Sequence, residues 1–226
     1  MPGGPRLNGF EAVLFDVDGT LVDSLETLVR GLGDTYEAFN GSRPKDEDLR
    51  AIIGLPLSRQ MAMFRETPPS DSQSAEMAEF AIERFRVHSD MEAAIRPAVA
   101  ALEHCHRHGL KTALVTSKST VELAEFLEKF PLAPFVDATV CSSDVEHPKP
   151  AADSALLACE RLGVPVPSAI MIGDSVFDLR CARAAGVGAV GVAYGATPYA
   201  TLEAEQPDAL FRTPDQLRQW IEATLN

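Results

Sequence analysis

The sequence predicts an α/β fold with a doubly wound parallel sheet (Rossmann-like) as its core and an α-helical domain inserted into that core. Two observations support this prediction. Five short runs of nearly continuous apolar residues occur along the chain, and such runs are typical of parallel strands covered on both faces. Helical stretches separate the last four runs, and strand–helix alternation of this kind favours a doubly wound sheet.

The five apolar runs are the predicted strands, and turn residues bound each of them. They cover residues 12–15, 111–115, 138–141, 169–172 and 189–192. Four helices are predicted around these strands, at residues 97–108, 121–130, 151–162 and 177–185. Pro97 begins the first of them, and Gly109, Gly163 and Gly186 follow three of the helices, which are the residue types that commonly start and end a helix.

A long helical stretch interrupts the alternation between the first and second strands. From about residue 21 to 91, apolar residues such as Leu25, Leu28 and Leu32 repeat at helical spacing, with no convincing strand and with loop signals at 40–44 and 67–71. This stretch is far longer than a crossover connection needs. We therefore predict two domains, a core formed by residues 1–20 and 93–226, and an inserted helical domain formed by residues 21–92.

Composition narrows the possible partners and location. The chain has 226 residues with 20 Lys and Arg against 33 Asp and Glu, a formal net charge of −13, which argues against nucleic acid as a partner. No apolar run is long enough to span a bilayer, so no membrane partner is expected. The four cysteines lie far apart and are expected to be reduced. The first residues lack the pattern of a secretory signal, and we expect a cytoplasmic monomer or homodimer.

Polar residues follow several of the predicted strands. Asp16 and Asp18 come directly after the first strand and are two residues apart, so they are expected to point to the same side. The other residues of this kind, at later strand ends or before the third helix, are Thr116, Ser117, Lys149, Asp174 and Asp178. Because ligands of open α/β sheets bind beyond the carboxyl ends of the strands, we expect these residues to share one crevice. Taken alone, Asp16 and Asp18 are equally well explained as turn residues whose carboxylates accept hydrogen bonds from the nearby backbone.

The residue types in this crevice indicate a metal and a phosphoryl group. Carboxylates gathered together repel one another unless a cation lies between them, and hard oxygen ligands favour Mg²⁺. A lysine and a hydroxyl group beside such a metal can hold a phosphoryl group. The sequence therefore predicts a magnesium site and a small phosphorylated metabolite as substrate.

At this point the chain resembles a known family. DVDGT at 16–20, the strand ending Thr116-Ser117-Lys118, Lys149-Pro150 and GDSVFD at 173–178 look like the four motifs of the haloacid dehalogenase-like hydrolase superfamily, in order and spacing. The inserted helical domain resembles the small α-helical cap of that superfamily. Among its members the chain looks most like the phosphoglycolate phosphatases, although these often have Asn where this chain has Ser117.

The resemblance implies a catalytic role for four residues. Asp16 would be the nucleophile that forms an aspartyl-phosphate, and with an ordinary carboxyl pKa of about 3.9 it is expected to be ionised at neutral pH. Asp18 would donate a proton to the leaving alcohol and then accept one from water. Thr116 would donate its hydroxyl to the transferring phosphoryl group, and Lys149 would neutralise charge on it.

The resemblance also implies ligands for the substrate and the metal. Gly19 and Ser117 would help Thr116 and Lys149 to bind the phosphate. Mg²⁺ would be held by the carboxylates of Asp16 and Asp174 and by the main-chain carbonyl of Asp18, with Asp178 supporting them. The implied activity is a Mg²⁺-dependent phosphatase acting on a small phosphomonoester, with phosphoglycolate as the best guess. Sugar phosphates, nucleotide monophosphates and pyrophosphate remain open.

Other functions stay possible on the same fold. A phosphosugar mutase (β-phosphoglucomutase-like) keeps the same four motifs, but it usually has a His- and aromatic-rich segment soon after the first motif, where this chain has residues 25–28, LETL. The presence of Asp18 rejects a dehalogenase, which would lack a carboxylate there, and a phosphonate hydrolase would need a cap lysine, whereas Lys45, the only one, is expected in a loop. A non-catalytic binding or regulatory module would not need Asp16, Asp18, Lys149 and Asp174 together.

Overall fold

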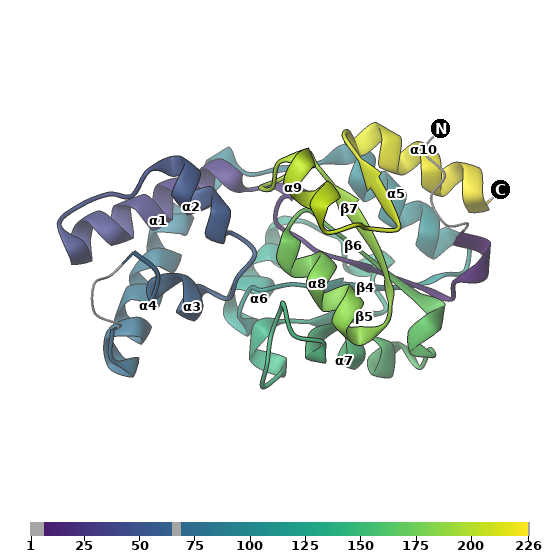
Figure 1. The fold of residues 1–226 in the computed structure, drawn as a ribbon, viewed down its shortest axis with the longest axis horizontal. Coiled ribbons are helices and arrows are strands. Elements are labelled where there is room, and N and C mark those ends of the chain that lie inside the picture. Colours follow the sequence, from purple (N-terminus) through teal and green to yellow (C-terminus); the bar gives the residue numbers. More distant parts are fainter. Residues whose placement is uncertain (1–6, 65–68, 226) are drawn as a thin grey trace.

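The computed structural model describes residues 7–64 and 69–225 of the chain. Its centre is a six-stranded sheet in which every neighbouring pair of strands is parallel (Figure 1). In spatial order the strands are β5 (Ala138–Val140), β4 (Lys111–Val115), β1 (Ala12–Phe15), β6 (Ala169–Gly173), β7 (Gly188–Val192) and β8 (Ala209–Phe211). From β1 the chain adds strands first on one side and later on the other, so the predicted doubly wound α/β fold is confirmed.

Helices cover both faces of this sheet because successive side chains of each buried strand point to opposite faces. Val13 and Phe15 belong to one apolar cluster, and Ala12 and Leu14 belong to the other. The first cluster is covered by α5 (Arg96–Arg107), α6 (Thr120–Lys129) and α10 (Pro214–Leu225). The second is covered by α7 (Asp153–Leu162), α8 (Val176–Ala185) and α9 (Tyr199–Ala204). Trp220 packs α10 against the sheet, as its position in a helical pattern predicts.

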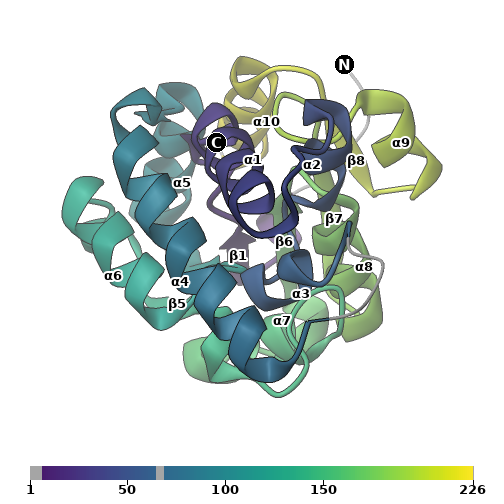
Figure 2. The ribbon, with the colours of Figure 1, turned by 90° about the vertical axis from the view of Figure 1, so that its left-hand side faces the viewer.

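A separate helical layer, here called the cap, follows the first strand (Figure 1, left side). Its helices are α1 (Leu25–Asn40), α2 (Asp46–Ile52), α3 (Leu57–Met61) and α4 (Asp71–His88). They enclose an apolar cluster of their own, which includes Leu32, Tyr36 and Met77. Figure 2 shows α1 and α4 side by side in front of one end of the sheet. The predicted domain boundaries at residues 20/21 and 92/93 stay a prediction. Residues 1–6, 65–68 and 226, which belong to the two predicted domains, lie outside the described residues.

The two connections between cap and core form a small sheet of their own. β2 (Val22–Asp23) pairs antiparallel with β3 (Ala93–Ala94), and the backbone N–H of Ile95 donates to the carbonyl of Leu21 at 2.9 Å. The expectation of no strand between residues 21 and 91 is therefore wrong at Val22 and Asp23. A pair of residues is too short to show strand periodicity, and only their meeting with β3 makes them a strand.

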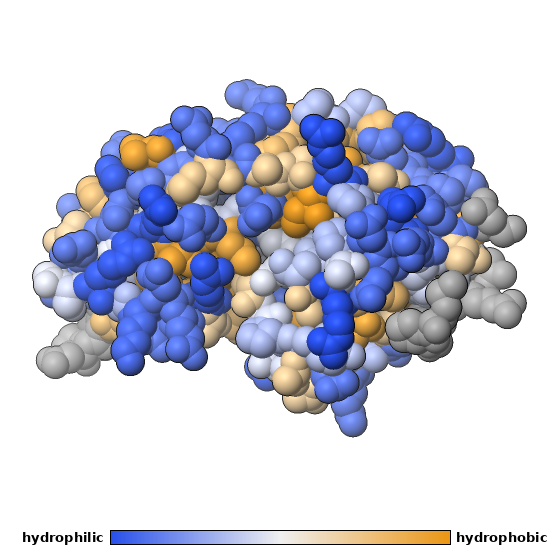
Figure 3. Space-filling view, turned by 90° about the horizontal axis from the view of Figure 1, so that it is seen from above, coloured by the Kyte–Doolittle hydropathy of each residue, from blue (hydrophilic) through white to orange (hydrophobic). Residues whose placement is uncertain are grey.

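Smaller elements complete the described part of the chain. Short 3₁₀ turns are η1 (Leu7–Gly9), η2 (Ser89–Met91), η3 (Ala133–Phe135), η4 (Ser142–Asp144) and η5 (Val166–Ser168). Among the described residues, no helix combines the length and the apolar character that a membrane span requires. The face in Figure 3 is mostly hydrophilic, with apolar patches gathered near the middle, where cap and core meet.

Candidate active site

The structure brings the predicted strand-end residues together at one edge of the sheet. Asp16 follows β1, Thr116 follows β4 and Asp174 follows β6. These three strands are neighbours and run parallel, so their carboxyl ends open on the same side, beside the point where the chain switches direction. All three side chains are at least nine-tenths buried. The site is therefore a product of sheet topology rather than of sequence proximity.

Lys149 lies beneath these strand ends and is almost completely buried, with 1% of its surface exposed. Its ammonium group donates to Asp16 Oδ1 at 2.7 Å, to Asp178 Oδ1 at 2.6 Å and to the carbonyl of Val115 at 3.0 Å. An ammonium group has three hydrogens to donate, and here each has an acceptor. Lys149 thus ties the ends of β1 and β4 to the start of α8.

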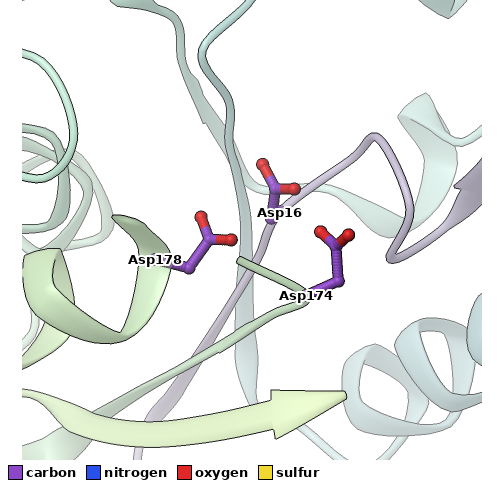
Figure 4. Close-up of side chains that lie close together, drawn as sticks. All are labelled: Asp16, Asp174 and Asp178. Atoms are coloured by element: carbon purple, nitrogen blue, oxygen red, sulfur yellow. The ribbon is translucent and has the colours of Figure 1, made fainter. Parts of the chain in front are cut away.

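Three carboxylates surround one point in the site (Figure 4). One oxygen from each of Asp16, Asp174 and Asp178 lies within 4.8 Å of the others. Asp178 is held in place by Ser175, whose backbone N–H and hydroxyl donate to its Oδ2 at 3.0 and 2.6 Å. Asp174 accepts from the backbone N–H of Ala196 at 2.6 Å and from the Thr20 hydroxyl at 3.3 Å. The carboxylates are therefore oriented by the fold.

The crowding of these carboxylates changes their acidity. Burial raises the pKa of Asp16 from 3.8 to about 7, and the charge of Asp178 adds to the rise while Lys149 opposes it. Burial and the charges of Asp16 and Asp178 raise the pKa of Asp174 well above its usual value. The expectation that Asp16 is ionised at neutral pH therefore depends on a bound cation, because a carboxyl group with a pKa of about 7 is only partly ionised there. That expectation used the acidity of an exposed carboxyl group, and the residue is buried.

The donor set fits a hard divalent cation. Four carboxylates at the site, those of Asp16, Asp18, Asp174 and Asp178, face two ammonium groups, those of Lys118 and Lys149. With all four carboxylates ionised, two negative charges are left uncompensated, and one divalent cation would balance them. Carboxylate and carbonyl oxygens are the ligands that Mg²⁺ prefers. A cation among them would also lower the raised pKa values.

Gly19 lets the chain turn tightly around Asp174. Its backbone lies in the left-handed region with φ of 73°, which costs glycine little and other residues more. A Cβ atom at this position would lie 2.2 Å from Asp174 Oδ2, closer than any real contact. The glycine of the first motif is thus required by the close approach of Asp174 to this turn.

Asp18 lines the same cavity as Asp16, as their spacing predicts, but its partners differ. The Ser24 hydroxyl donates to Asp18 Oδ1 at 2.6 Å, and Lys118 Nζ lies 2.8 Å from Asp18 Oδ2. Sequence reasoning assigned no role to Lys118. The sequence did offer a signal for Lys118, because it follows Thr116 and Ser117 directly after the second predicted strand, and those two residues were identified as site residues by that position.

Thr116 and Ser117 use their hydroxyl groups differently. Thr116 Oγ1 accepts from the backbone N–H of Lys118 at 3.2 Å, which leaves its hydrogen available to donate. The Ser117 hydroxyl instead donates to the carbonyl of Gly54 in the cap at 2.6 Å. Ser117 therefore links core to cap, and its backbone and the lone pairs of its hydroxyl are what it offers to a ligand.

Between core and cap lies a cavity of about 40 Å³, here called the site cavity. Its core side is formed by Asp16, Asp18, Thr116, Ser117, Lys118 and Asp174. Its cap side is formed by Leu28, Ile53, Gly54, Leu55, Leu57, Gln60 and Phe85. The cap segment at residues 54–58 thus reaches the site through Gly54, Leu55 and Leu57. The cavity is therefore small while the cap keeps this position.

Comparison with known proteins identifies the family. The family model described as haloacid dehalogenase-like hydrolase matches residues 13–192, well over half of the chain. The chain is 31% identical to the phosphoglycolate phosphatase of Agrobacterium fabrum, covering 87% of this chain and 86% of that protein. This chain belongs to the haloacid dehalogenase-like hydrolase family. The sequence-based prediction of that family, and of an enzyme of its phosphatase type, is confirmed.

Some relatives of this hydrolase are named phosphoglycolate phosphatase, and others are named pyrophosphatase. The chain is 28% identical to the pyrophosphatase PpaX of Bacillus velezensis, covering 91% of this chain and 94% of that protein. A hydrolase from Pseudomonas syringae superposes with a TM-score of 0.85 at 22% identity, covering 94% of this chain and 98% of that one. The structural likeness shows a shared fold, cap included.

Proposed function

We propose that this hydrolase is a Mg²⁺-dependent phosphatase that cleaves a small phosphomonoester resembling phosphoglycolate, through an aspartyl-phosphate on Asp16. The observation that carries the proposal is the buried ion-pair network in which Lys149 contacts Asp16 and Asp178 beside Asp174. Burying these charges is costly, and a purely structural fold would not need them. The names of the relatives support a phosphoryl substrate.

The residues that would hold Mg²⁺ are the carboxylates of Asp16 and Asp174 and the main-chain carbonyl of Asp18. Both Asp178 oxygens already accept hydrogen bonds from Lys149 or Ser175, which supports a role for Asp178 in orienting Lys149 and the metal ligands. When bound, the metal would supply positive charge that offsets the repulsion between the Asp16 carboxylate and an anionic phosphoryl group.

Asp16 would attack the phosphorus atom with a carboxylate oxygen and displace the leaving alcohol. Because Lys149 donates to Oδ1, Oδ2 is the oxygen without this lysine partner and is the better candidate for attack. Lys149 keeps the carboxylate in one orientation and places positive charge beneath the transferring group. Water would then hydrolyse the aspartyl-phosphate and restore Asp16.

Asp18 would manage the proton in both steps. In its protonated form it would donate a proton to the leaving oxygen, and the carboxylate left behind, which pairs with Lys118, would then accept one from the attacking water. Thr116 would donate its hydroxyl hydrogen to a phosphoryl oxygen, with Gly19 and Ser117 contributing to the same binding surface. The apolar cap side of the site cavity would exclude other water molecules during the first step.

We also propose a small phosphorylated metabolite as the physiological partner and the cytoplasm as the location. The small site cavity supports the first proposal. All four cysteines are buried and free, which supports the second, because reduced thiols are usual in that compartment.

Phosphate release tests the proposed function. With phosphoglycolate or p-nitrophenyl phosphate as substrate, we expect turnover with Mg²⁺ and none after chelation by EDTA. Asp16→Asn keeps the size of the side chain but not its nucleophilicity, and it should lower kcat by at least about 10³-fold. Full activity of that variant would exclude Asp16 as the nucleophile, and lack of turnover by the wild type across a panel of phosphorylated metabolites would exclude the phosphatase.

A further inference from the structure

Lys118 occupies a position that the proposed mechanism does not use. Its side chain is 12% exposed and forms an ion pair of 2.8 Å with Asp18. Its backbone is fixed on both sides, since its N–H donates to Thr116 Oγ1 at 3.2 Å and its carbonyl accepts from the backbone N–H and the hydroxyl of Ser142 at 2.9 and 3.0 Å. The side chain of Lys118 therefore extends from a backbone that is held in place by hydrogen bonds, at the edge of the core side.

Among the described residues that line the site cavity, Lys118 supplies the one positive charge. Lys149 lies below the cavity, and all its hydrogens are already donated. Lys118 faces a cavity otherwise lined by carboxylates, hydroxyls, the amide of Gln60 and apolar side chains.

The leaving group of a bound substrate would lie next to this lysine. In the proposed mechanism the leaving oxygen contacts the carboxylate of Asp18, and Lys118 Nζ is 2.8 Å from Asp18 Oδ2. Any charged group joined to that oxygen through one or two atoms falls within reach of the ammonium group. The cap residues described as lining the cavity offer no charged side chain.

We propose that Lys118 selects substrates whose leaving group is itself anionic, by pairing with that anion beside Asp18. The proposal rests on the proposed function and sharpens it. Without Lys118, the carboxylates of Asp16, Asp18 and Asp174 would repel such a leaving group. The shared chemistry is a second negative charge on a small phosphate compound, which either a carboxylate or a second phosphate can supply.

Binding measurements in the Asp16→Asn background test this without turnover. The ligands are phosphoglycolate, pyrophosphate and hydroxyethyl phosphate, in which a neutral alcohol replaces the carboxylate, each titrated calorimetrically with Mg²⁺ present. Lys118→Gln, which can still donate to Asp18 but has no charge, should weaken binding of the two anionic-leaving-group ligands by about 10- to 100-fold. Binding of hydroxyethyl phosphate should change by less than about threefold.

Two further variants serve as rescue and control. Lys118→Arg restores the charge and should recover most of the lost affinity for the carboxylate or the phosphate ligand, and the ligand that recovers best indicates which anion the cavity fits. Lys111→Met removes a lysine at the other end of β4, where it pairs with Asp137 at 3.5 Å, and should leave all three affinities unchanged.

The possible outcomes separate Lys118 from the reaction itself. If Lys118→Gln weakens all three ligands equally, or none of them, or if none binds, the proposal is overturned. If the wild type hydrolyses hydroxyethyl phosphate as efficiently as phosphoglycolate and pyrophosphate, the proposal fails while the phosphatase stands. If the wild type turns over none of the three but Asp16→Asn still discriminates through Lys118, the anion site stands and the proposed function fails.

Discussion

The two sides of the site cavity are built differently. On the core side Asp18 pairs with Lys118, and Asp16 pairs with Lys149, which lies beneath the cavity and also contacts Asp178. The cap side is mostly apolar, and Gln60, its one polar side chain among the described residues, has an amide oxygen without a hydrogen-bond partner. Its amide nitrogen donates to the carbonyl of Leu55 at 2.7 Å.

This difference indicates how reaction and substrate are divided between the two sides. A catalytic group must be held in one geometry, which requires partners for every lone pair and hydrogen. A wall that only shapes a cavity can be apolar and can change its outline without disturbing that geometry. We infer that the core side determines the chemistry and that the cap side, together with Lys118, determines which substrate fits.

The largest effect is expected on the core side, at Lys149. Lys149→Met should lower kcat by about 10²- to 10³-fold, since it removes a fixed positive charge next to the transferring group. It should also destabilise the fold by about 3–5 kcal/mol, because Asp16 and Asp178 would lose a buried partner. Steady-state kinetics and urea unfolding measure the two effects, and Lys111→Met, at an exposed ion pair, is the control. A kcat within about threefold of the wild type would show that the network is structural only.

A second effect of the core side is a link between pH, metal and stability. The raised pKa of Asp16 means that the folded state binds a proton more tightly than the unfolded state does. Stability without metal should therefore fall as pH rises from the ordinary value of 3.8 towards about 7. Mg²⁺ requires the ionised carboxylates, so it should restore this loss mainly above that range.

Thermal unfolding measures this link. Saturating Mg²⁺ should raise Tm by about 5–10 °C at pH 8 and by much less at pH 5. Asp174→Asn removes a carboxylate from the cluster and should abolish most of the difference between the two pH values. An equal shift of Tm at both pH values would mean that the metal binds away from these carboxylates.

Much of the fold could be predicted because its long elements carry clear periodicity. The strand predicted at residues 12–15 matches β1, and the helix predicted at 97–108 matches α5 within one residue. β2 and β3 have two residues each, too few for a pattern to show. These short strands form because tertiary contacts bring their backbones together.

The candidate site divides in the same way. Residue types at strand ends were enough to find Asp16, Thr116 and Asp174, because parallel strands open on one edge. The pairing of Lys118 with Asp18 and the raised pKa of Asp16 could not be predicted. Both depend on distances between side chains that are about 100 residues or more apart in the chain, as Asp16 and Lys149 are. Such distances exist only after folding.

The smallest effect is expected where core and cap touch, at Ser117. Its hydroxyl donates to the carbonyl of Gly54 at 2.6 Å, so it stabilises the cap in its present position over the cavity. Ser117→Ala removes one neutral hydrogen bond, worth about 1 kcal/mol, and should raise KM by about fivefold with little change in kcat. Steady-state kinetics with the best substrate measures this.

Thr35→Val is the matched control for Ser117→Ala. The Thr35 hydroxyl also donates to a backbone carbonyl, that of Gly31 at 2.7 Å, but within one cap helix. Removing it should affect stability alone and leave KM unchanged. If Ser117→Ala lowers kcat and kcat/KM equally, then the hydroxyl acts in the transition state and Ser117 belongs with the core-side catalytic groups. A rise in KM alone would instead show that the Ser117 hydroxyl holds the cap over the cavity. Ser117 would then act on substrate binding and not on the chemical step, although it lies on the core side.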